Sequence, residues 1–226
     1  MRKLFFVTIC CLLVCSPDLA QETEGKKEKI VKGLLHTIIY LKDGSSAEGY
    51  LQNSTPGVYV TYHIPDALDS LMILKPDNKL FTKSRKFRNC EIDSMTTWLD
   101  EHPMMRMKWE PQFVDFTFGN KSSELDTYPA MLNVLYQGKH VKGYISTHML
   151  YGFKLLFKTD DMPCAKAFLK PDQKFSEKRR KTLLDTFYMY PEMEVYIKGL
   201  TKKDIQDDAF CILKKLDSIL SAGDSQ

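Results

Sequence analysis

The chain has 226 residues, of which 43% are hydrophobic and 27% are charged, and its formal net charge is +3 at pH 7. This length is enough for one domain with a substantial core or for two small domains. A charge so close to neutral predicts no obligatory polyanionic partner, so nucleic acid is excluded as the expected ligand.

The first 20 residues predict a cleavable secretory signal peptide. Residues 2 and 3 are basic, residues 4–14 are uncharged, and a short polar exit ends at Ala20 before Gln21. A basic start, an apolar centre and a small residue at the cut are the three parts of an export signal. The apolar centre is shorter than the roughly 20 residues that a membrane-spanning helix needs, and no later apolar stretch is long enough. We therefore expect a secreted or periplasmic protein without a transmembrane segment in its mature chain.

Three of the six cysteines lie in the predicted signal peptide, and one of them, Cys15, would be the modified residue if the leader were a lipoprotein signal. The mature chain keeps Cys90, Cys164 and Cys211. Three thiols permit at most one disulfide within a monomer, and their spacing fits no metal-binding or redox motif. We expect buried free thiols, with a bridge between Cys90 and Cys164 as the alternative.

A flexible lead-in is expected over residues 21–29, which are charged and lack large apolar groups. Residues 30–172 then alternate apolar and polar positions in short runs, the pattern of an antiparallel β domain. The clearest signal is a hairpin of His36–Leu41 and Ala47–Leu51. Asp43-Gly44 between these runs favours a tight primed turn.

A second hairpin is predicted between Leu71–Leu74 and Lys79–Thr82, because Pro76 and the Asp-Asn pair after it favour a type I turn. Further strands are expected at 57–63, 91–98, 105–109, 112–118, 131–136, 140–145 and 152–157. Strands this short and this numerous indicate an antiparallel sheet that is rolled or sandwiched.

The apolar spacing changes to three and four after Pro171, so a C-terminal helical segment is predicted over residues 173–221. Helices are expected at 175–190 and 191–198, and a last helix begins behind Thr201, which forms a capping box with Asp204. The apolar stripe of this last helix predicts that it packs on the sheet. A disordered tail is expected at 222–226. The predicted fold class is α+β.

Motifs of recognised chemistry are missing from the sequence. It has no nucleophile elbow, no glycine-rich phosphate loop and no signature around a mature cysteine. The histidines of the mature chain do not follow a zinc-binding spacing, and they are His36, His63, His102, His140 and His148. The acidic stretch Asp100–Pro103 is expected to be an exposed turn rather than a set of metal ligands. We therefore expect no metal and no other cofactor, and we assign no catalytic residue.

Two basic runs stand out. One lies at 178–181, where Glu177 can pair with Lys181, and the candidate binding residues of the other are Lys83, Arg85, Lys86 and Arg88. On an edge strand such side chains commonly block pairing with another chain. The functional alternative is electrostatic docking to an acidic surface, such as phosphorylated lipid, lipopolysaccharide or an anionic polysaccharide.

Aromatic residues crowd the predicted β domain, and most are expected in the core or in cross-strand pairs. Any that lie exposed on one face of the sheet could stack on sugar rings or on a partner protein. These residues are Tyr40, Tyr50, Tyr59, Tyr62, Trp98, Trp109, Phe113, Phe116 and Phe118.

Several short motifs follow one another in a suggestive order. A basic signal ends in Ala20-Gln21, Lys42–Leu51 contains Lys-Asp-Gly and Glu-Gly-Tyr-Leu, and Glu91–Met95 and Tyr190–Met193 follow. This order resembles that of a group of exported β-rich proteins of Bacteroides-type bacteria. The resemblance implies a periplasmic or cell-envelope setting. It assigns no site residues, because the group has no established activity.

The sequence as a whole favours an exported, non-catalytic module that binds a partner or contributes structure in the cell envelope or the extracellular space. The expected partner is an acidic surface, a glycan or an envelope protein, and the oligomeric state stays open. The alternative is a hydrolase of an envelope or extracellular polymer with its site between sheet and helices. Converging His, Asp or Glu side chains in a concave pocket would favour the hydrolase, whereas an exposed aromatic or basic face would favour the binding module.

Overall fold

The computed structural model describes residues 34–52, 55–56, 62–63, 71–78, 82–119, 127–146, 153–171 and 174–224. Ten of the described strands form one sheet in the order β12-β11-β10-β9-β8-β7-β1-β2-β5-β6, followed in the chain by a C-terminal helical segment. Strands β3 (Thr55–Pro56) and β4 (Tyr62–His63) pair separately. The fold is α+β, as the sequence predicts. The expected signal peptide, the lead-in and most of the strand expected at 57–63 lie outside the described residues.

The N-terminal half of the sheet is antiparallel and buries one face. Its members are β1 (Leu35–Leu41), β2 (Ser46–Leu51), β5 (Leu71–Lys75), β6 (Arg85–Arg88) and β7 (Ile92–Leu99), with the short 3-10 helix η1 (Asn89–Glu91) before β7. Alternate residues of β1 point into a core, where Leu35 and Ile39 meet Met72 of β5 and Met95 of β7. The partner of β5 is β6, not the expected strand at 79–82, of which residues 79–81 lie outside the described part.

The predicted first hairpin is confirmed, but its turn is longer than a two-residue primed turn. Leu41 and Ser45 face each other, and the amide of Gly44 donates to the carbonyl of Leu41 at 3.0 Å. Gly44 has φ +84°, a conformation that glycine adopts without strain. The Asp43 carboxylate accepts from the Ser45 amide at 2.8 Å and thereby fixes this three-residue form.

The C-terminal half closes on itself. It contains β8 (His102–Asp115), β9 (Thr127–Gln137), β10 (Val141–Ser146), β11 (Lys154–Thr159) and β12 (Ala165–Leu169). These strands form an antiparallel meander, and β12 then pairs in parallel with β8 through Ala165 opposite Val114. Leu132, Tyr144 and Leu156 share the interior with these residues. The result is a small five-stranded barrel.

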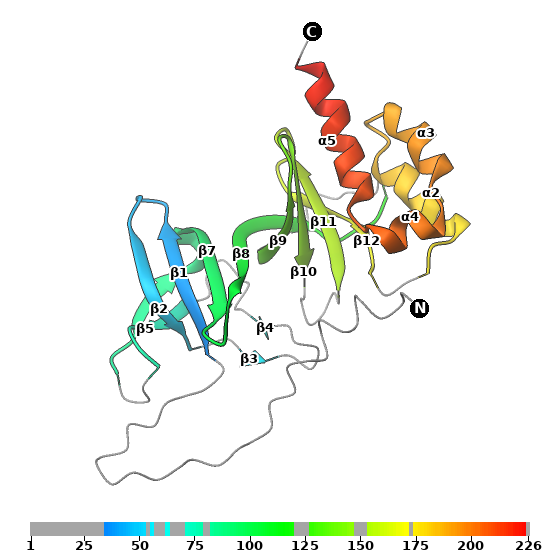
Figure 1. The fold of residues 1–226 in the computed structure, drawn as a ribbon. Helices are drawn as coiled ribbons and strands as arrows, with labels where there is room; N and C mark the ends of the chain where they lie inside the picture. The colour runs from blue at the N-terminus through cyan, green and yellow to red at the C-terminus, as the bar shows by residue number, and fades with distance from the viewer. Residues whose placement is uncertain are drawn as a thin grey trace.

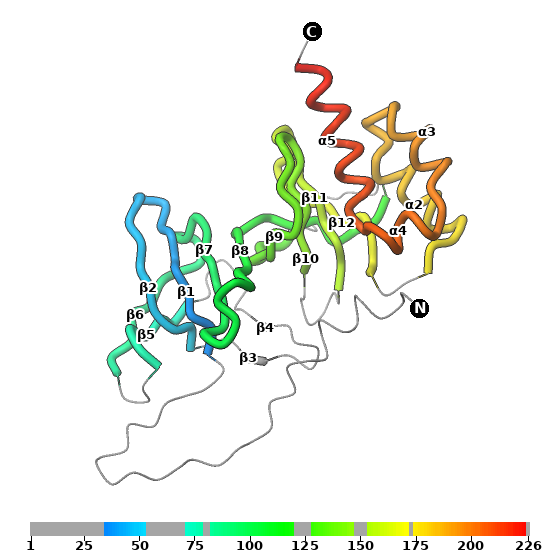
Figure 2. The backbone as a smooth tube through the Cα atoms, viewed as in Figure 1, coloured from blue at the N-terminus to red at the C-terminus, as the bar shows by residue number. Residues whose placement is uncertain are grey.

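Strand β8 belongs to both halves (Figure 2). The sequence predicts two strands here, at 105–109 and 112–118, but the structure has one of 14 residues with Pro111 inside it. Proline lacks an amide proton and is tolerated in a strand where one edge is unpaired. That edge of β8 is unpaired around Pro111 within the described part of the chain, because its pairing with β7 ends at Trp109 and its pairing with β12 begins at Val114.

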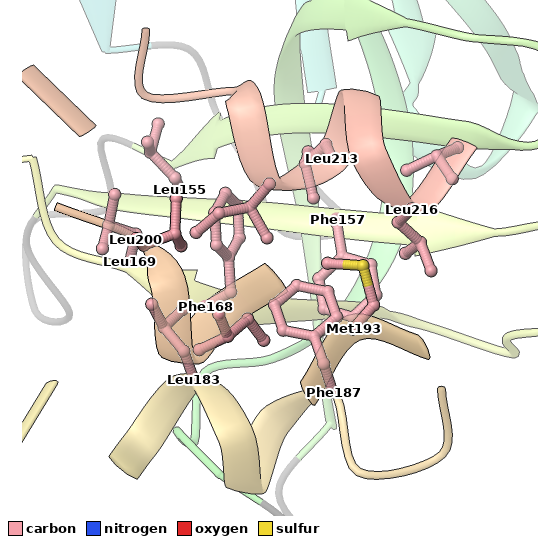
Figure 3. Close-up of a cluster of buried hydrophobic side chains, with 13 residues drawn as sticks. Leu155, Phe157, Phe168, Leu169, Leu183, Phe187, Met193, Leu200, Leu213 and Leu216 are labelled. Carbon is pink, nitrogen blue, oxygen red and sulfur yellow. The ribbon is translucent and has the colours of Figure 1, made fainter. Parts of the chain in front are cut away.

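The helices pack together on the outer face of the barrel, away from β1 and β2 (Figure 1). They are α2 (Glu177–Thr186), α3 (Glu192–Gly199), α4 (Lys202–Asp207) and α5 (Cys211–Gly223). Their apolar side chains meet the outward-facing side chains of the sheet (Figure 3), where the Phe187 ring stacks on Phe157 at 4.7 Å and meets Phe168 edge-on. The strand β12 was not among the predicted elements.

The predicted last helix is interrupted. The capping box of Thr201 and Asp204 is confirmed and begins α4, but α4 ends at Asp207. The Asp208 carboxylate accepts from the Phe210 amide at 2.9 Å, so this side chain holds a turn where the helix was expected to continue. A separate helix, α5, then runs to Gly223, into the expected tail.

Helix α5 is joined to the turn between β9 and β10 by Asp217. Its carboxylate accepts from the backbone amides of Lys139, His140 and Val141 at 3.1, 2.7 and 3.0 Å. A Cβ atom at Gly138 would lie 2.3 Å from this carboxylate, so a side chain at that position would displace Asp217 from these hydrogen bonds. In β10, Gly143 lets the Leu213 side chain of α5 approach the sheet, since a Cβ atom at Gly143 would lie 2.7 Å from Leu213.

Two further sequence expectations concern the membrane and the cysteines. None of the helices in the described ranges is long and apolar enough to cross a membrane. The three described cysteines are free, so the alternative of a bridge between Cys90 and Cys164 is wrong here. Cys164 and Cys211 are partly buried, but Cys90 is exposed rather than buried.

Candidate functional site

A groove of about 530 Å³ lies beside the unpaired edge of β8. The consecutive residues Glu110, Pro111, Gln112 and Phe113 all line it, although their side chains alternate between the two faces of the strand. A groove can contact both faces only where it lies along the edge of a strand. It therefore occupies the gap that opens where β8 leaves β7 and has not yet met β12.

The walls of the groove come from both halves of the molecule. Asp93 and Ser94 lie at the start of β7, and Pro163 precedes β12. The lining residues include four lysines but only two carboxylates, Asp93 and Glu110, so the groove has an excess of positive charge. The remaining lining residues are Lys42, Cys90, Lys108, Lys142 and Lys158.

Glu110 fixes two of these lysines. This side chain is 8% exposed, and its carboxylate lies 2.9 Å from Nζ of Lys108 and 3.0 Å from Nζ of Lys142. The hydroxyl of Tyr144, which is fully buried at the barrel interior, donates to Oε2 of Glu110 at 3.1 Å. Lys108 and Lys142 are 43% and 40% exposed, so their ammonium groups are held in place and still reach solvent.

Gln112 fixes the third lysine. Nζ of Lys158, on β11, donates to Oε1 of Gln112 at 2.9 Å. A lysine side chain in water loses considerable rotamer freedom when it binds a ligand. Because Glu110 and Gln112 have already ordered Lys108, Lys142 and Lys158, part of that loss has occurred before any ligand arrives.

Electrostatics keep Glu110 ionised. Burial opposes ionisation, but the hydrogen bonds from Lys108 and Lys142 outweigh it and lower the pKa of Glu110. Burial, and then the charge of Glu110, raise the pKa of Tyr144, so its hydroxyl stays a donor. A carboxyl with a lowered pKa is poorly suited to donate a proton as a general acid near neutral pH.

The predicted binding residues lie elsewhere. Strand β6 is the terminal strand of the sheet, and there the side chains of Arg85, Lys86 and Arg88 are exposed, as is Lys83 just before the strand. None of the four is among the residues that line the groove. The guanidinium of Arg85 lies over the ring of Phe87 at 5.1 Å. This location fits both the edge-blocking interpretation and an accessible basic surface, which stays a prediction.

One residue of the second basic run, Arg180, is built into the fold. Nη1 of Arg180 donates to the carbonyls of Ile197, Lys198 and Leu200 at 2.7 to 2.8 Å and so caps the end of α3. Glu177 pairs with Arg180 at 3.2 Å, three residues away, in place of the expected pairing with Lys181. At least one cation of this run is therefore structural.

The histidine side chains that the structure describes, those of His36, His102 and His140, do not line the groove. His36 lies between Glu48 and Asp100, both at 3.0 Å, and its ring stacks on Tyr50 and Trp98. Asp100 and Glu101 form the exposed turn that was expected, whereas His102 and Pro103 already belong to β8. The hydrogen bond that Tyr50 donates to Asp100 is the main cause that raises the pKa of this tyrosine to about 12.

A second histidine makes a similar pair of contacts at the far end of α5. His140 lies 2.9 Å from Asp160 and 2.7 Å from Asp224. Within the described ranges, no three His, Cys, Asp or Glu side chains are arranged to hold a metal ion. His148 and the side chain of His63 lie outside the described part.

Of the aromatic residues named from the sequence, the structure describes seven side chains, of which three are buried, two are partly buried and two are exposed, one of them in the groove. Trp98, Trp109 and Phe116 are 5 to 7% exposed, whereas Phe113 is 50% exposed. Tyr40, at 42%, is also exposed but does not line the groove.

Sequence reasoning missed the lysines of the groove, because Lys108, Lys142 and Lys158 lie far apart in the chain. Glu110 gave no signal either, because it precedes Pro111 where the sequence predicts a break between two strands, and a residue there is expected in solvent. Comparisons of the chain with known protein families, with curated proteins and with solved structures gave no match. The groove therefore has to be interpreted from its own chemistry.

Proposed function

We propose that this protein is an exported, non-catalytic binding module that receives an anionic ligand in the groove beside β8. The main support is that Lys108, Lys142 and Lys158, from three strands, are held around one groove by Glu110 and Gln112. Fixed ammonium groups with spare donors are suited to carboxylate, sulfate or phosphate oxygens. Export is proposed from the sequence of residues 1–20, and the envelope setting from the resemblance to exported proteins.

Binding is favoured over the alternative of hydrolysis. No histidine in the described part of the chain lines the groove, and the pKa of Glu110 is lowered rather than raised. A hydrolase of the paired-carboxylate type requires one carboxyl that keeps its proton near neutral pH. The ion pairs of Glu110 lower its pKa and so favour loss of that proton.

The test uses inorganic tripolyphosphate, a compact polyanion that contains no sugar and no peptide. We expect measurable binding that weakens as the salt concentration rises, because salt screens charges. A K142Q/K158Q double variant should bind at least about tenfold more weakly, because each lost charged hydrogen bond costs about 1.5–3 kcal/mol. A K178Q/K181Q variant, which neutralises two lysines of α2, is the matched control and should bind normally.

The basic run on β6 provides the competing surface. If the quadruple alanine variant of Lys83, Arg85, Lys86 and Arg88 loses binding while K142Q/K158Q retains it, the groove is not the site.

The export part is checked on protein recovered from outside the cytoplasm of its source cells, whose first residue should lie near Gln21. An intact Met1 in that protein would contradict cleavage.

A further inference from the structure

The shape of the groove limits what can lie in it. The unpaired edge of β8 spans the four residues from Glu110 to Phe113, or about 13 Å at roughly 3.3 Å per residue. Strand β7 begins at one end of this edge and β12 at the other. A compact ligand fits between these two strands, whereas a long extended chain in the plane of the sheet would meet one of them.

The edge is also a poor template for a peptide strand. Recognition by strand addition depends on a row of backbone donors and acceptors along the free edge. Pro111 lies within the four-residue edge and has no amide proton, so it interrupts the row. The groove must therefore recognise its ligand mainly through side chains.

Those side chains combine cations with ring surfaces. Phe113 is 50% exposed, and Pro111 and Pro163 add apolar surface to the lining of the groove. Gln112, which holds Nζ of Lys158 at 2.9 Å, precedes Phe113 in β8, so this lysine and the ring border the groove from opposite faces of the strand and meet a ligand along its edge. Ser94 and Gln112 add neutral hydrogen-bonding groups. A compact ligand that satisfies all of these groups has a ring with an apolar face, hydroxyls at its rim and a negative charge.

From this combination we propose that the ligand is an acidic oligosaccharide, with one sugar ring packed on Phe113 and its carboxylate or sulfate groups paired with Lys142 and Lys158. This inference rests on the proposed function, since it names the ligand class of the same groove. Ring packing on an exposed aromatic residue provides contact area that a small inorganic anion cannot use. Phe113 therefore distinguishes the sugar from other anions, and the lysines do not.

The experiment measures binding by calorimetry to two acidic sugars, trigalacturonate as the carboxylate arm and a heparin tetrasaccharide as the sulfate arm. Fully methyl-esterified trigalacturonate removes the charge and keeps the rings, and a pentaglutamate peptide keeps the charge and removes the rings. We expect at least one acidic sugar to bind, and both the ester and the peptide to bind at least tenfold more weakly.

The decisive variant is F113A, and the matched control is Y188A, because Tyr188 is an exposed aromatic residue, 61% accessible, at the turn after α2. F113A should weaken the acidic sugar by about tenfold and leave tripolyphosphate binding unchanged, while Y188A changes neither. Both replacements are on the surface, so folding is expected to survive, and circular dichroism checks it.

The outcomes separate the two proposals. Unchanged sugar affinity in F113A, or pentaglutamate that binds as tightly as the acidic sugars, overturns the oligosaccharide. Tripolyphosphate binding that depends on Lys142 and Lys158, without binding of either acidic sugar, also rejects the oligosaccharide and leaves the anion groove standing. Absence of binding by tripolyphosphate and by both acidic sugars rejects the proposed function itself.

Discussion

The two halves of the sheet differ in how many of their faces are buried. In the N-terminal half, β1 buries alternate residues against one core, and its other face presents partly exposed groups such as His36. In the C-terminal half, five of the six residues of β11 are buried, because the barrel interior covers one face and the helices cover the other. A strand between two cores contributes side chains to both, so the C-terminal half should tolerate less change.

The largest test of this difference compares two phenylalanines. F187A removes a ring that is 1% exposed and packed on Phe157 and Phe168 beneath the helices, and a loss of about 3–5 kcal/mol in the free energy of unfolding is expected. F87A removes a ring that is 6% exposed on the terminal strand β6, where the neighbouring structure can relax into the space. Its loss should be smaller by about 1 kcal/mol or more. Urea unfolding measures both, and an equal or larger loss in F87A would contradict the comparison.

A smaller effect is expected at the contact between α5 and the barrel. D217N replaces a carboxylate that accepts from three backbone amides, and hydrogen bonds to a charged group support a loss of about 1–3 kcal/mol. D207N, at the exposed end of α4, removes the same charge and should stay within about 0.5 kcal/mol of the native protein. Thermal unfolding of both variants at pH 7 decides, and similar melting temperatures would show that Asp217 does not hold α5.

The smallest effect is a pH dependence from His140. The hydrogen bond to Asp160 is the largest cause that raises the pKa of His140, Asp224 raises it further, and Lys139 and burial oppose the shift. A raised pKa in the folded state means that the imidazolium stabilises the fold below about pH 6.5, the ordinary value, and that this contribution is lost as pH rises through the folded pKa.

The melting temperature should therefore fall between pH 6 and pH 8 more steeply in the native protein than in H140Q. D160N removes one of the two carboxylates around the ring and should give an intermediate slope. Identical slopes in the native protein and in H140Q would exclude the contribution of His140.

The contrast between the halves also explains which elements the sequence could predict. Strand β1 and its hairpin follow from the alternation of HTIIYL and from Asp43-Gly44, since one buried face imposes a period of two. Strand β12 was missed because AKAFL is buried on both faces and so has no alternation. The sequence predicted a break between two strands at Pro111, but β8 continues through this residue. The proline is tolerated because one edge of β8 is unpaired there, and this gap depends on the positions of β7, β8 and β12 rather than on the local sequence.

The candidate site was less accessible to prediction than the fold. A contiguous basic run such as Lys83–Arg88 is conspicuous in a sequence, whereas Lys108, Lys142 and Lys158 meet only through the pairing of β8, β9, β10 and β11. In the sequence each is a single lysine in a strand, which alternation places in solvent. The burial of Glu110, which brings two of them together, also depends on the register of the barrel, because the sequence predicts a break between strands at this residue.

Because β8 is shared, the chain offers no point between the two halves at which it could be divided. A fragment that ends before β8 would leave the inner edge of β7 open and uncover Met95, which lies opposite Trp109. A fragment that begins at β8 would keep the barrel but expose the half of β8 that pairs with β7. Open strand edges flanked by apolar surface are templates for aggregation. Expression of either part alone should therefore give insoluble protein, and the intact chain should unfold in a single transition.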